Sequence, residues 1–195
     1  MEPMILASSS PRRQEILKDL GIPFISVIPD CKEDMPETGD PAEIACGNAQ
    51  KKLALAREIS KDISANWILS ADTLVFQENR IFGKPKDRAE AAAMLHGFSG
   101  KSHGIVTAVC LYSRKTDSVL SRISRTRVSF MQLSAQAVEN YLESGEWQGA
   151  AGGYKIQGIA SCFVTDMCGS WTGAVGLPVH DLYEMLLESH YDFVI

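Results

Sequence analysis

Residues 5–14 read ILASSSPRRQ, a short apolar run that meets three serines, a proline and two arginines. The apolar residues predict a buried strand over Met4–Ala7. A proline at the first helical position predicts a helix directly after Ser10, which is a good N-cap residue. A strand that leads straight into a helix is typical of α/β folds. The first turn of this helix holds Arg12 and Arg13, where the helix dipole is already positive.

Two interpretations fit this opening stretch. The start of a helix offers unpaired N–H groups, the serines at 8–10 offer hydroxyls, and Arg12 and Arg13 add guanidinium groups. Together these donors would bind one phosphate group. Alternatively, both arginines are solvated and tolerate a small electrostatic penalty. The residues alone leave both interpretations open.

Composition excludes several classes of protein. The chain has 195 residues, 45% hydrophobic and 22% charged, which predicts one domain over 1–195 with two lobes and no clear linker. A net charge of -5 without a dominant basic stripe argues against a general nucleic-acid-binding protein. No run approaches the ~18 apolar residues of a membrane span, and the N-terminus lacks the features of a signal peptide. The five scattered cysteines fit a reducing compartment. We therefore expect a cytoplasmic protein that binds neither nucleic acid nor a membrane.

Strands and helices alternate along the rest of the chain. The pattern predicts strands over 24–28, 67–76, 81–82 and about 160–165, and a long hairpin over 105–112 and 119–130. It predicts helices over 41–59, 87–97, 134–145 and about 180–189. Start signals for three of these helices are Asp40, Asp87 and Ser134. Because hairpins occur among the alternating elements, the fold class is α/β with a mixed sheet rather than a regular doubly wound one.

Asp72 and Lys52 are candidates for chemistry because each places a charge in an apolar setting. Asp72 lies in WILSADTLVF at 67–76, and a buried carboxylate is costly unless it meets a cation, a metal or a water that it activates. A carboxylate tied to a neighbouring backbone N–H is the alternative. Lys52 lies on a helix face of small residues, where its ammonium either meets an anion or reaches out to water.

Lys84 and Gln157 give weaker signals. Lys84 lies in the turn FGKP at 82–85, near the end of the strand that holds Asp72; a solvated lysine is the alternative. Gln157 lies beside glycines in KIQG at 155–158, and its amide can read a nucleobase edge because it both donates and accepts. An ordinary polar side chain is the alternative.

Two short motifs match catalytic signatures in the wrong context. Residues 100–104 read GKSHG, which matches G-x-S-x-G, but a helix is expected before Ser102 and a strand after it, the reverse of a serine hydrolase. The same GKS lacks the earlier glycine of a P-loop, because Leu95 stands there. The four histidines show no metal-ligand spacing. We reject these motifs as sites.

Taken together, these segments resemble the Maf family of nucleoside triphosphate pyrophosphatases. Besides Lys52, the matching segments are ILASSSPRRQEIL at 5–17, SADTLVF at 70–76, FGKP at 82–85, FSGKSHGIVTAV at 98–109, GGYKIQG at 152–158 and VGLPV at 175–179. The resemblance implies a long mixed β-sheet that floors a cleft between two lobes, with helices packed on it, similar to inosine triphosphatases. It also implies a homodimer.

The implied reaction is hydrolysis of a nucleoside triphosphate to the monophosphate and pyrophosphate, with Mg²⁺ or Mn²⁺ as a divalent cofactor. By this resemblance Asp72 is the proton acceptor or a metal ligand, and Glu33 is a second candidate ligand. The positions linked to specificity are Arg12, Thr73 and Gln157. The other implied substrate-binding residues are Ser8, Arg13, Lys52 and Lys84.

The segment KIQG resembles the branch that hydrolyses dTTP and UTP, and we expect modified pyrimidine triphosphates as further substrates. The branch specific for 7-methyl-GTP usually carries serine and glutamate where Ile156 and Gln157 stand. This chain has Ala150 where the dTTP/UTP branch commonly has a lysine, and it has Lys155 nearby. The alternatives are 7-methyl-GTP specificity and a non-catalytic nucleotide-binding regulator of cell division.

Overall fold

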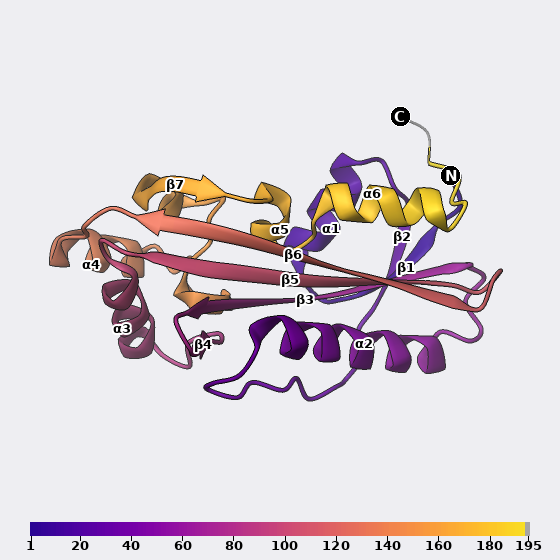
Figure 1. Ribbon diagram of the computed structural model, residues 1–195, viewed down its shortest axis with the longest axis horizontal. Helices are drawn as coiled ribbons and strands as arrows, with labels where there is room; N and C mark the ends of the chain where they lie inside the picture. The colour runs from indigo at the N-terminus through magenta and orange to yellow at the C-terminus, as the bar shows by residue number, and fades with distance from the viewer. Residues whose placement is uncertain (194–195) are drawn as a thin grey trace.

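Seven strands form one mixed sheet, and the computed structural model describes residues 1–193 of the chain. Six of them follow the order β2-β1-β3-β5-β6-β7, and β4 pairs with β3 beside this path (Figure 1). The strands are β1 (Met4–Ala7), β2 (Phe24–Val27), β3 (Trp67–Gln77), β4 (Arg80–Phe82), β5 (Ser102–Ser113), β6 (Ser118–Phe130) and β7 (Val164–Cys168).

The sheet contains both kinds of strand pairing. Strand β1 runs parallel to β2 and β3, whereas the pairs β3–β4, β3–β5, β5–β6 and β6–β7 are antiparallel. The expected hairpin over 105–130 is confirmed as β5 and β6, which pair from Ser102↔Ser129 to Ser113↔Ser118. The α/β class with a mixed sheet is therefore confirmed.

Helices cover both faces of the sheet. The helix α2 (Pro41–Ile59) lies on one face, below β3 in Figure 1, and α1 (Pro11–Asp19), α5 (Trp171–Val175) and α6 (Val179–Glu188) lie on the other. The helices α3 (Arg88–Phe98) and α4 (Ala135–Glu143) lie together at the left-hand end.

Side chains alternate between the two faces, as the period of a strand requires. On β5, Ala108 and Cys110 pack in the core under α2, whereas Val109 and Leu111 pack in the core under α1 and α6. A third, aromatic cluster fills the end near α3 and α4 and includes Phe98, Phe130, Tyr141, Tyr154 and Phe163. No helix within residues 1–193 is long and apolar enough to cross a membrane.

Local signals placed most helix starts correctly. The side chains of Asp40, Asp87 and Ser134 accept from the backbone N–H groups of Ala42, Glu90 and Ala137, as capping residues do. At the first helix, Ser10 occupies the N-cap position but its side chain makes no capping hydrogen bond. The strand-to-helix turn at residues 8–11 is therefore confirmed, without the side-chain cap.

One expected strand begins later than the sequence pattern indicated. The residues Ile159–Phe163 form a 3₁₀ helix, and β7 begins only at Val164. Ala160 and Phe163 are buried whereas the two residues between them are exposed, a spacing of three that suits a 3₁₀ turn. The sequence analysis also did not identify α5.

Candidate active site

One cavity of about 240 Å³ opens where the carboxyl end of β1 meets β3 and the start of α1. All nine site residues expected from the family resemblance line it: Ser8, Arg12, Arg13, Glu33, Lys52, Asp72, Thr73, Lys84 and Gln157. These residues come from six separate segments of the chain, spread from residue 8 to residue 157. The fold brings them close enough to contact one small molecule.

At one end of the cavity, the serine–arginine turn makes its own hydrogen bonds. The Oγ atom of Ser8 accepts from the backbone N–H of Ser10 at 3.1 Å and from Nη1 of Arg13 at 3.0 Å. With two bonds accepted, the hydroxyl proton of Ser8 is free to be donated. Arg12 is half-buried in the cavity wall, and burial lowers the pKa of its guanidinium.

Arg13 is buried and held by three oxygen atoms. Its Nε donates to the carbonyl of Gly176 at 2.8 Å, and its Nη2 donates to Oγ1 of Thr73 at 3.1 Å, in addition to the bond to Ser8. Burial lowers the pKa of Arg13, and the carboxylates of Asp72 and Glu33 act in the opposite direction. An arginine has five N–H donors, so this geometry leaves two for a ligand.

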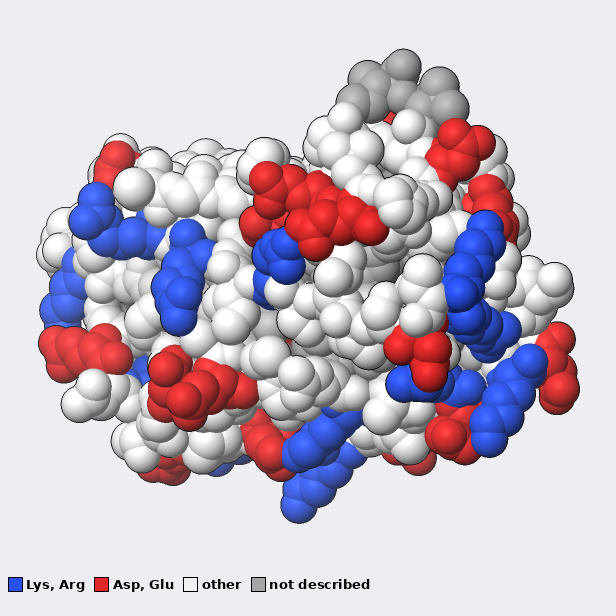
Figure 2. Space-filling model, turned by 45° about the vertical axis from the view of Figure 1, so that its right-hand side comes forward, with Lys and Arg blue, Asp and Glu red and all other residues white. Residues whose placement is uncertain are grey.

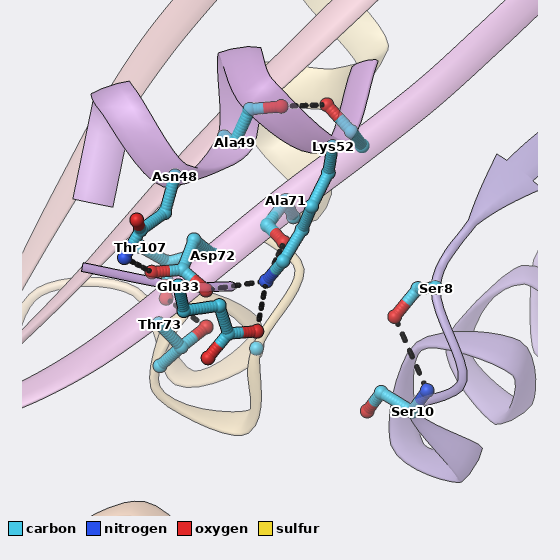
Figure 3. Close-up of polar contacts among 12 residues, drawn as sticks. Ser8, Ser10, Glu33, Asn48, Ala49, Lys52, Ala71, Asp72, Thr73 and Thr107 are labelled. Atoms are coloured by element: carbon cyan, nitrogen blue, oxygen red, sulfur yellow. Dashed lines mark hydrogen bonds and ion pairs between the residues drawn. The ribbon is translucent and has the colours of Figure 1, made fainter. Parts of the chain in front are cut away.

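Lys52 joins two carboxylates on the other side of the cavity (Figure 3). Its Nζ lies 2.6 Å from Oδ1 of Asp72 and 2.7 Å from Oε1 of Glu33. Asp72 therefore pairs with a side-chain cation, and the alternative of a carboxylate bound only by backbone N–H groups is wrong. Partial burial acts to raise the pKa of Glu33, but the hydrogen bond and charge of Lys52, with Lys84 and Arg13, lower it overall.

Small residues on α2 explain why Lys52 reaches Asp72. Ala45, Ala49 and Ala56 are fully buried on the same helix face, so the helix lies close to the sheet. The Oγ atom of Ser70 on β3 donates to the carbonyl of Ala49 at 2.8 Å. This close approach directs the Lys52 side chain over β3 instead of outward to water.

Asn48 is a site residue that the sequence analysis missed. It is 1% exposed, its Nδ2 donates to Oδ2 of Asp72 at 3.0 Å, and it binds both backbone groups of Asp34. Asn48 precedes Lys52 by four residues, so both side chains lie on one helix face. This spacing was the signal that could have identified Asn48.

Lys84 and Gln157 lie in the exposed part of the cavity wall. Gln157 follows Gly152 and Gly153, which have φ of 71° and 72°. A Cβ at Gly152 would lie 3.0 Å from the Val75 side chain, so glycine lets this segment approach β3 closely.

Charge in the cavity favours an anionic ligand. Five basic side chains line it (Arg12, Arg13, Lys52, Lys84 and Lys155), against the two carboxylates of Glu33 and Asp72. Figure 2 shows one face of the molecule, on which basic and acidic side chains are interspersed over the described residues. Within the cavity, basic side chains therefore outnumber acidic ones, as suits a small polyanion.

Ser102, whose motif was rejected as a site in the sequence analysis, does not line this cavity. It follows α3 and begins β5, and its hydroxyl lies 2.8 Å from that of Ser129. The adjacent His103 turns inward to the hydroxyl of Tyr154. This geometry gives no nucleophile and base pair of the serine hydrolase kind.

A divalent cation fits the donor set at Glu33 and Asp72. Their carboxylate oxygens face the same ammonium, so this position already accommodates positive charge. Among residues 1–193, no group of three or more His, Cys, Asp and Glu side chains could hold a metal ion. Mg²⁺ is commonly held by one or two carboxylates together with substrate phosphates. The two carboxylates suit that arrangement, with the remaining ligands supplied by substrate and water.

A family model and several curated relatives match nearly the whole chain. The family model described as Maf-like protein matches residues 3–189. A dTTP/UTP pyrophosphatase of Treponema denticola is 42% identical over 203 aligned residues, covering 98% of each chain. The dTTP/UTP pyrophosphatase of Symbiobacterium thermophilum is 40% identical and covers 98% of this chain and 96% of its own. The solved structure of the Staphylococcus aureus Ham1 protein aligns over 66% of this chain and 72% of its own, with 16% identity and a TM-score of 0.45.

Proposed function

The chain belongs to the Maf family, and on this premise we propose that it hydrolyses dTTP and UTP to the nucleoside monophosphate and pyrophosphate. The observation that carries the proposal is the single cavity in which the Ser8–Arg13 turn and Asp72 both lie. A triphosphate tail bound at that turn stays within reach of the carboxylate.

In the proposed reaction, water attacks the α-phosphorus of the nucleotide. A new P–O bond forms, the bond between the α-phosphorus and the bridging oxygen breaks, and pyrophosphate leaves. The carboxylate of Asp72 accepts the proton from the attacking water. Asn48 and Lys52 each bind one oxygen of this carboxylate, which fixes its orientation.

The basic side chains stabilise the charge that develops on the phosphate oxygens. Arg13 is already fixed by three acceptors, so its two remaining N–H groups need little reorganisation. Ser8 and the first turn of α1 donate further hydrogen bonds, and Arg12 and Lys84 add charge at the cavity wall.

Glu33 and Asp72 are the residues that would hold Mg²⁺ or Mn²⁺. A bound divalent cation would neutralise phosphate charge and lower the pKa of water. Lys52 pairs with both carboxylates, so its ammonium balances part of their negative charge.

Gln157 supports a pyrimidine preference. Its exposed amide lies in the cavity wall and can donate and accept at once, as the edge of thymine or uracil requires. Modified pyrimidine triphosphates that keep this edge are proposed substrates as well.

The decisive experiment is a panel of nucleotides assayed for pyrophosphate release with Mg²⁺ and with Mn²⁺. We expect dTTP and UTP to give the highest kcat/KM, above the purine triphosphates and 7-methyl-GTP. A preference for 7-methyl-GTP would overturn the base assignment alone. Tight nucleotide binding without turnover under either metal would overturn the enzymatic proposal and favour the nucleotide-binding regulator.

A cytoplasmic homodimer that binds no nucleic acid stays a prediction. The mixed charges on the face in Figure 2 support the expectation that the protein binds no nucleic acid. Light scattering on the purified protein tests the dimer, and fractionation of cells tests the location.

A further inference from the structure

A chain of hydroxyl groups runs from the cavity into the protein behind Arg13. Thr73 on β3 lies in the cavity wall, and its Oγ1 lies 2.9 Å from Oγ1 of Thr107 on β5. Thr107 is 1% exposed and donates to the carbonyl of Gly173 in α5 at 2.8 Å. Resting on the function proposed above, we propose that Thr107 is a positioning residue that fixes Arg13 through Thr73.

The direction of each hydrogen bond in this chain follows from the last acceptor. A carbonyl oxygen only accepts, so the hydroxyl proton of Thr107 is used by Gly173. The Oγ1 of Thr107 therefore accepts from Thr73, which uses the single hydroxyl proton of Thr73. The Oγ1 of Thr73 is then left as an acceptor, and it accepts from Nη2 of Arg13 at 3.1 Å.

This direction separates the roles of the two hydroxyls in the cavity. Ser8 has its proton free to donate to a phosphate oxygen, whereas the proton of Thr73 is used inside the protein. Thr73 therefore acts on the substrate site mainly by accepting a hydrogen bond from Arg13 and so holding its guanidinium in place. Its influence on substrate choice would act through the placement of that guanidinium.

Two of the three hydrogen bonds that hold Arg13, those to Gly176 and Thr73, lead to the same short helix. Nε donates to Gly176, the C-cap residue of α5, and the hydroxyl chain ends at Gly173 within α5. A Cβ at Gly173 would lie 2.7 Å from Oγ of Ser124, and Gly176 has φ of 127°, so both positions favour glycine. The guanidinium is thus fixed in its plane by two routes from one element.

Thr126 offers a matched control on the neighbouring strand. It is 4% exposed and, like Thr107, donates to a backbone carbonyl near α5, that of Ser170 at 2.9 Å. Its Oγ1 also accepts from the N–H of Ser170 at 3.1 Å, so its hydrogen bonds end at the N-cap residue of α5 and include neither Thr107 nor Thr73 nor Arg13. Thr126→Val removes a comparable buried hydrogen bond and leaves the hydrogen bonds from Arg13 through Thr73 and Thr107 to Gly173 intact.

The test compares Thr107→Val, Thr107→Ser and Thr126→Val. We expect Thr107→Val to lower kcat/KM for dTTP by about 10- to 100-fold, because a displaced catalytic group is costly. Thr107→Ser keeps the hydroxyl and should restore most of this loss. Thr126→Val should keep wild-type kcat/KM even where its melting temperature falls as far as that of Thr107→Val.

A second measurement does not depend on activity. The Nε–H signal of Arg13 in ¹H–¹⁵N NMR of the full chain reports how firmly the guanidinium is held. Hydrogen exchange at this group should be faster in Thr107→Val than in wild type, and unchanged in Thr126→Val. Unchanged exchange at Arg13 in Thr107→Val would overturn the positioning role, whether or not the protein hydrolyses nucleotides. A wild-type protein without turnover would overturn the proposed function and leave the exchange result to decide this inference.

Discussion

The Nζ atom of Lys52 lies 2.6 Å from Oδ1 of Asp72, and the two side chains are 10% and 6% exposed. A buried charge without a partner is costly, so neither group is stable in this position alone. The pair therefore links stability to function. The ammonium of Lys52 balances the negative charge of Asp72, and it also lies in the cavity where a polyanion would bind.

Replacing Lys52 with Met should destabilise the protein far more than replacing its neighbour. Lys52→Met leaves Asp72 buried without its cation, and breaking such a pair costs about 3–5 kcal/mol of the free energy of unfolding. Lys51 pairs with Asp34 at the surface, so Lys51→Met should cost less than about 1 kcal/mol. Urea denaturation of both variants measures the difference, and equal losses would contradict the buried pair.

Asp72→Asn should lower kcat for dTTP by about 10² to 10⁴, because the amide is not a base. The control is Asp117→Asn, in the exposed turn between β5 and β6, where the carboxylate accepts from Tyr112. Steady-state pyrophosphate release compares the two variants. Near-normal turnover in Asp72→Asn would remove this carboxylate from the mechanism.

His103 should make the protein less stable in mild acid. Burial lowers its pKa from 6.5 to about 4, and its Nε2 lies 2.6 Å from the hydroxyl of Tyr154. Between these pH values the unfolded chain binds a proton that the folded chain does not, so the free energy of unfolding falls as the pH falls. The loss from this group reaches roughly 3 kcal/mol by pH 4.

Urea denaturation between pH 7 and pH 4 tests this effect in wild type and His103→Gln. The variant cannot titrate at this position, so its stability should decline less steeply with falling pH. His96→Gln is the control, because His96 is exposed on α3 and meets water in both states. A His103→Gln curve parallel to wild type would rule the effect out.

Local patterns predicted the elements better than the contacts between them. The capping residues Asp40, Asp87 and Ser134 and the long hairpin act over a few residues, so the sequence alone was enough. The 3₁₀ turn at Ile159–Phe163 was missed because a short apolar run suits several conformations, and its packing in the aromatic cluster decides between them.

In the site, too, local patterns predicted individual residues better than the contacts between them. The family motifs gave the residues that line the cavity, but Asn48 and Thr107 were missed. Each is a polar residue with one partner far away in the sequence, 24 residues from Asn48 to Asp72 and 66 residues from Thr107 to Gly173. The four-residue spacing to Lys52 places Asn48 on the same helix face, but the partners Asp72 and Gly173 are revealed only by the folded chain.

Gln157→Leu should reduce the preference for pyrimidine nucleotides. Leucine has a similar size but cannot pair with a base edge, so kcat/KM for dTTP and UTP should fall by about 10- to 100-fold. Purine triphosphates should change little, because the phosphate site stays intact. Gln148→Leu, an exposed glutamine outside the cavity, is the control. An equal loss for all nucleotides would show that Gln157 does not read the base.

We predict that Asn48 on α2 holds the segment that contains Glu33 and Asp34 in its place beside this helix. Its Oδ1 accepts from the N–H of Asp34 at 2.8 Å, and its Nδ2 donates to the carbonyl of Asp34 at 2.9 Å. Asn48→Ala removes both bonds, so the amide of Asp34 should exchange its hydrogen faster, and pyrophosphate release should fall as Glu33 loses its fixed position. Hydrogen exchange followed by NMR measures the amide directly.

Asn48→Asp separates the two functions of this side chain. The carboxylate keeps an acceptor for the N–H of Asp34 but loses the donor to Asp72 and places a second negative charge beside it. The Asp34 amide should then stay closer to wild-type protection than in Asn48→Ala, whereas activity should fall in both variants because Asp72 is displaced in each. If the Asp34 amide exchanges at the wild-type rate in Asn48→Ala, the segment is held by other contacts, and the bond from Asn48 to Asp72 alone must account for any loss of turnover.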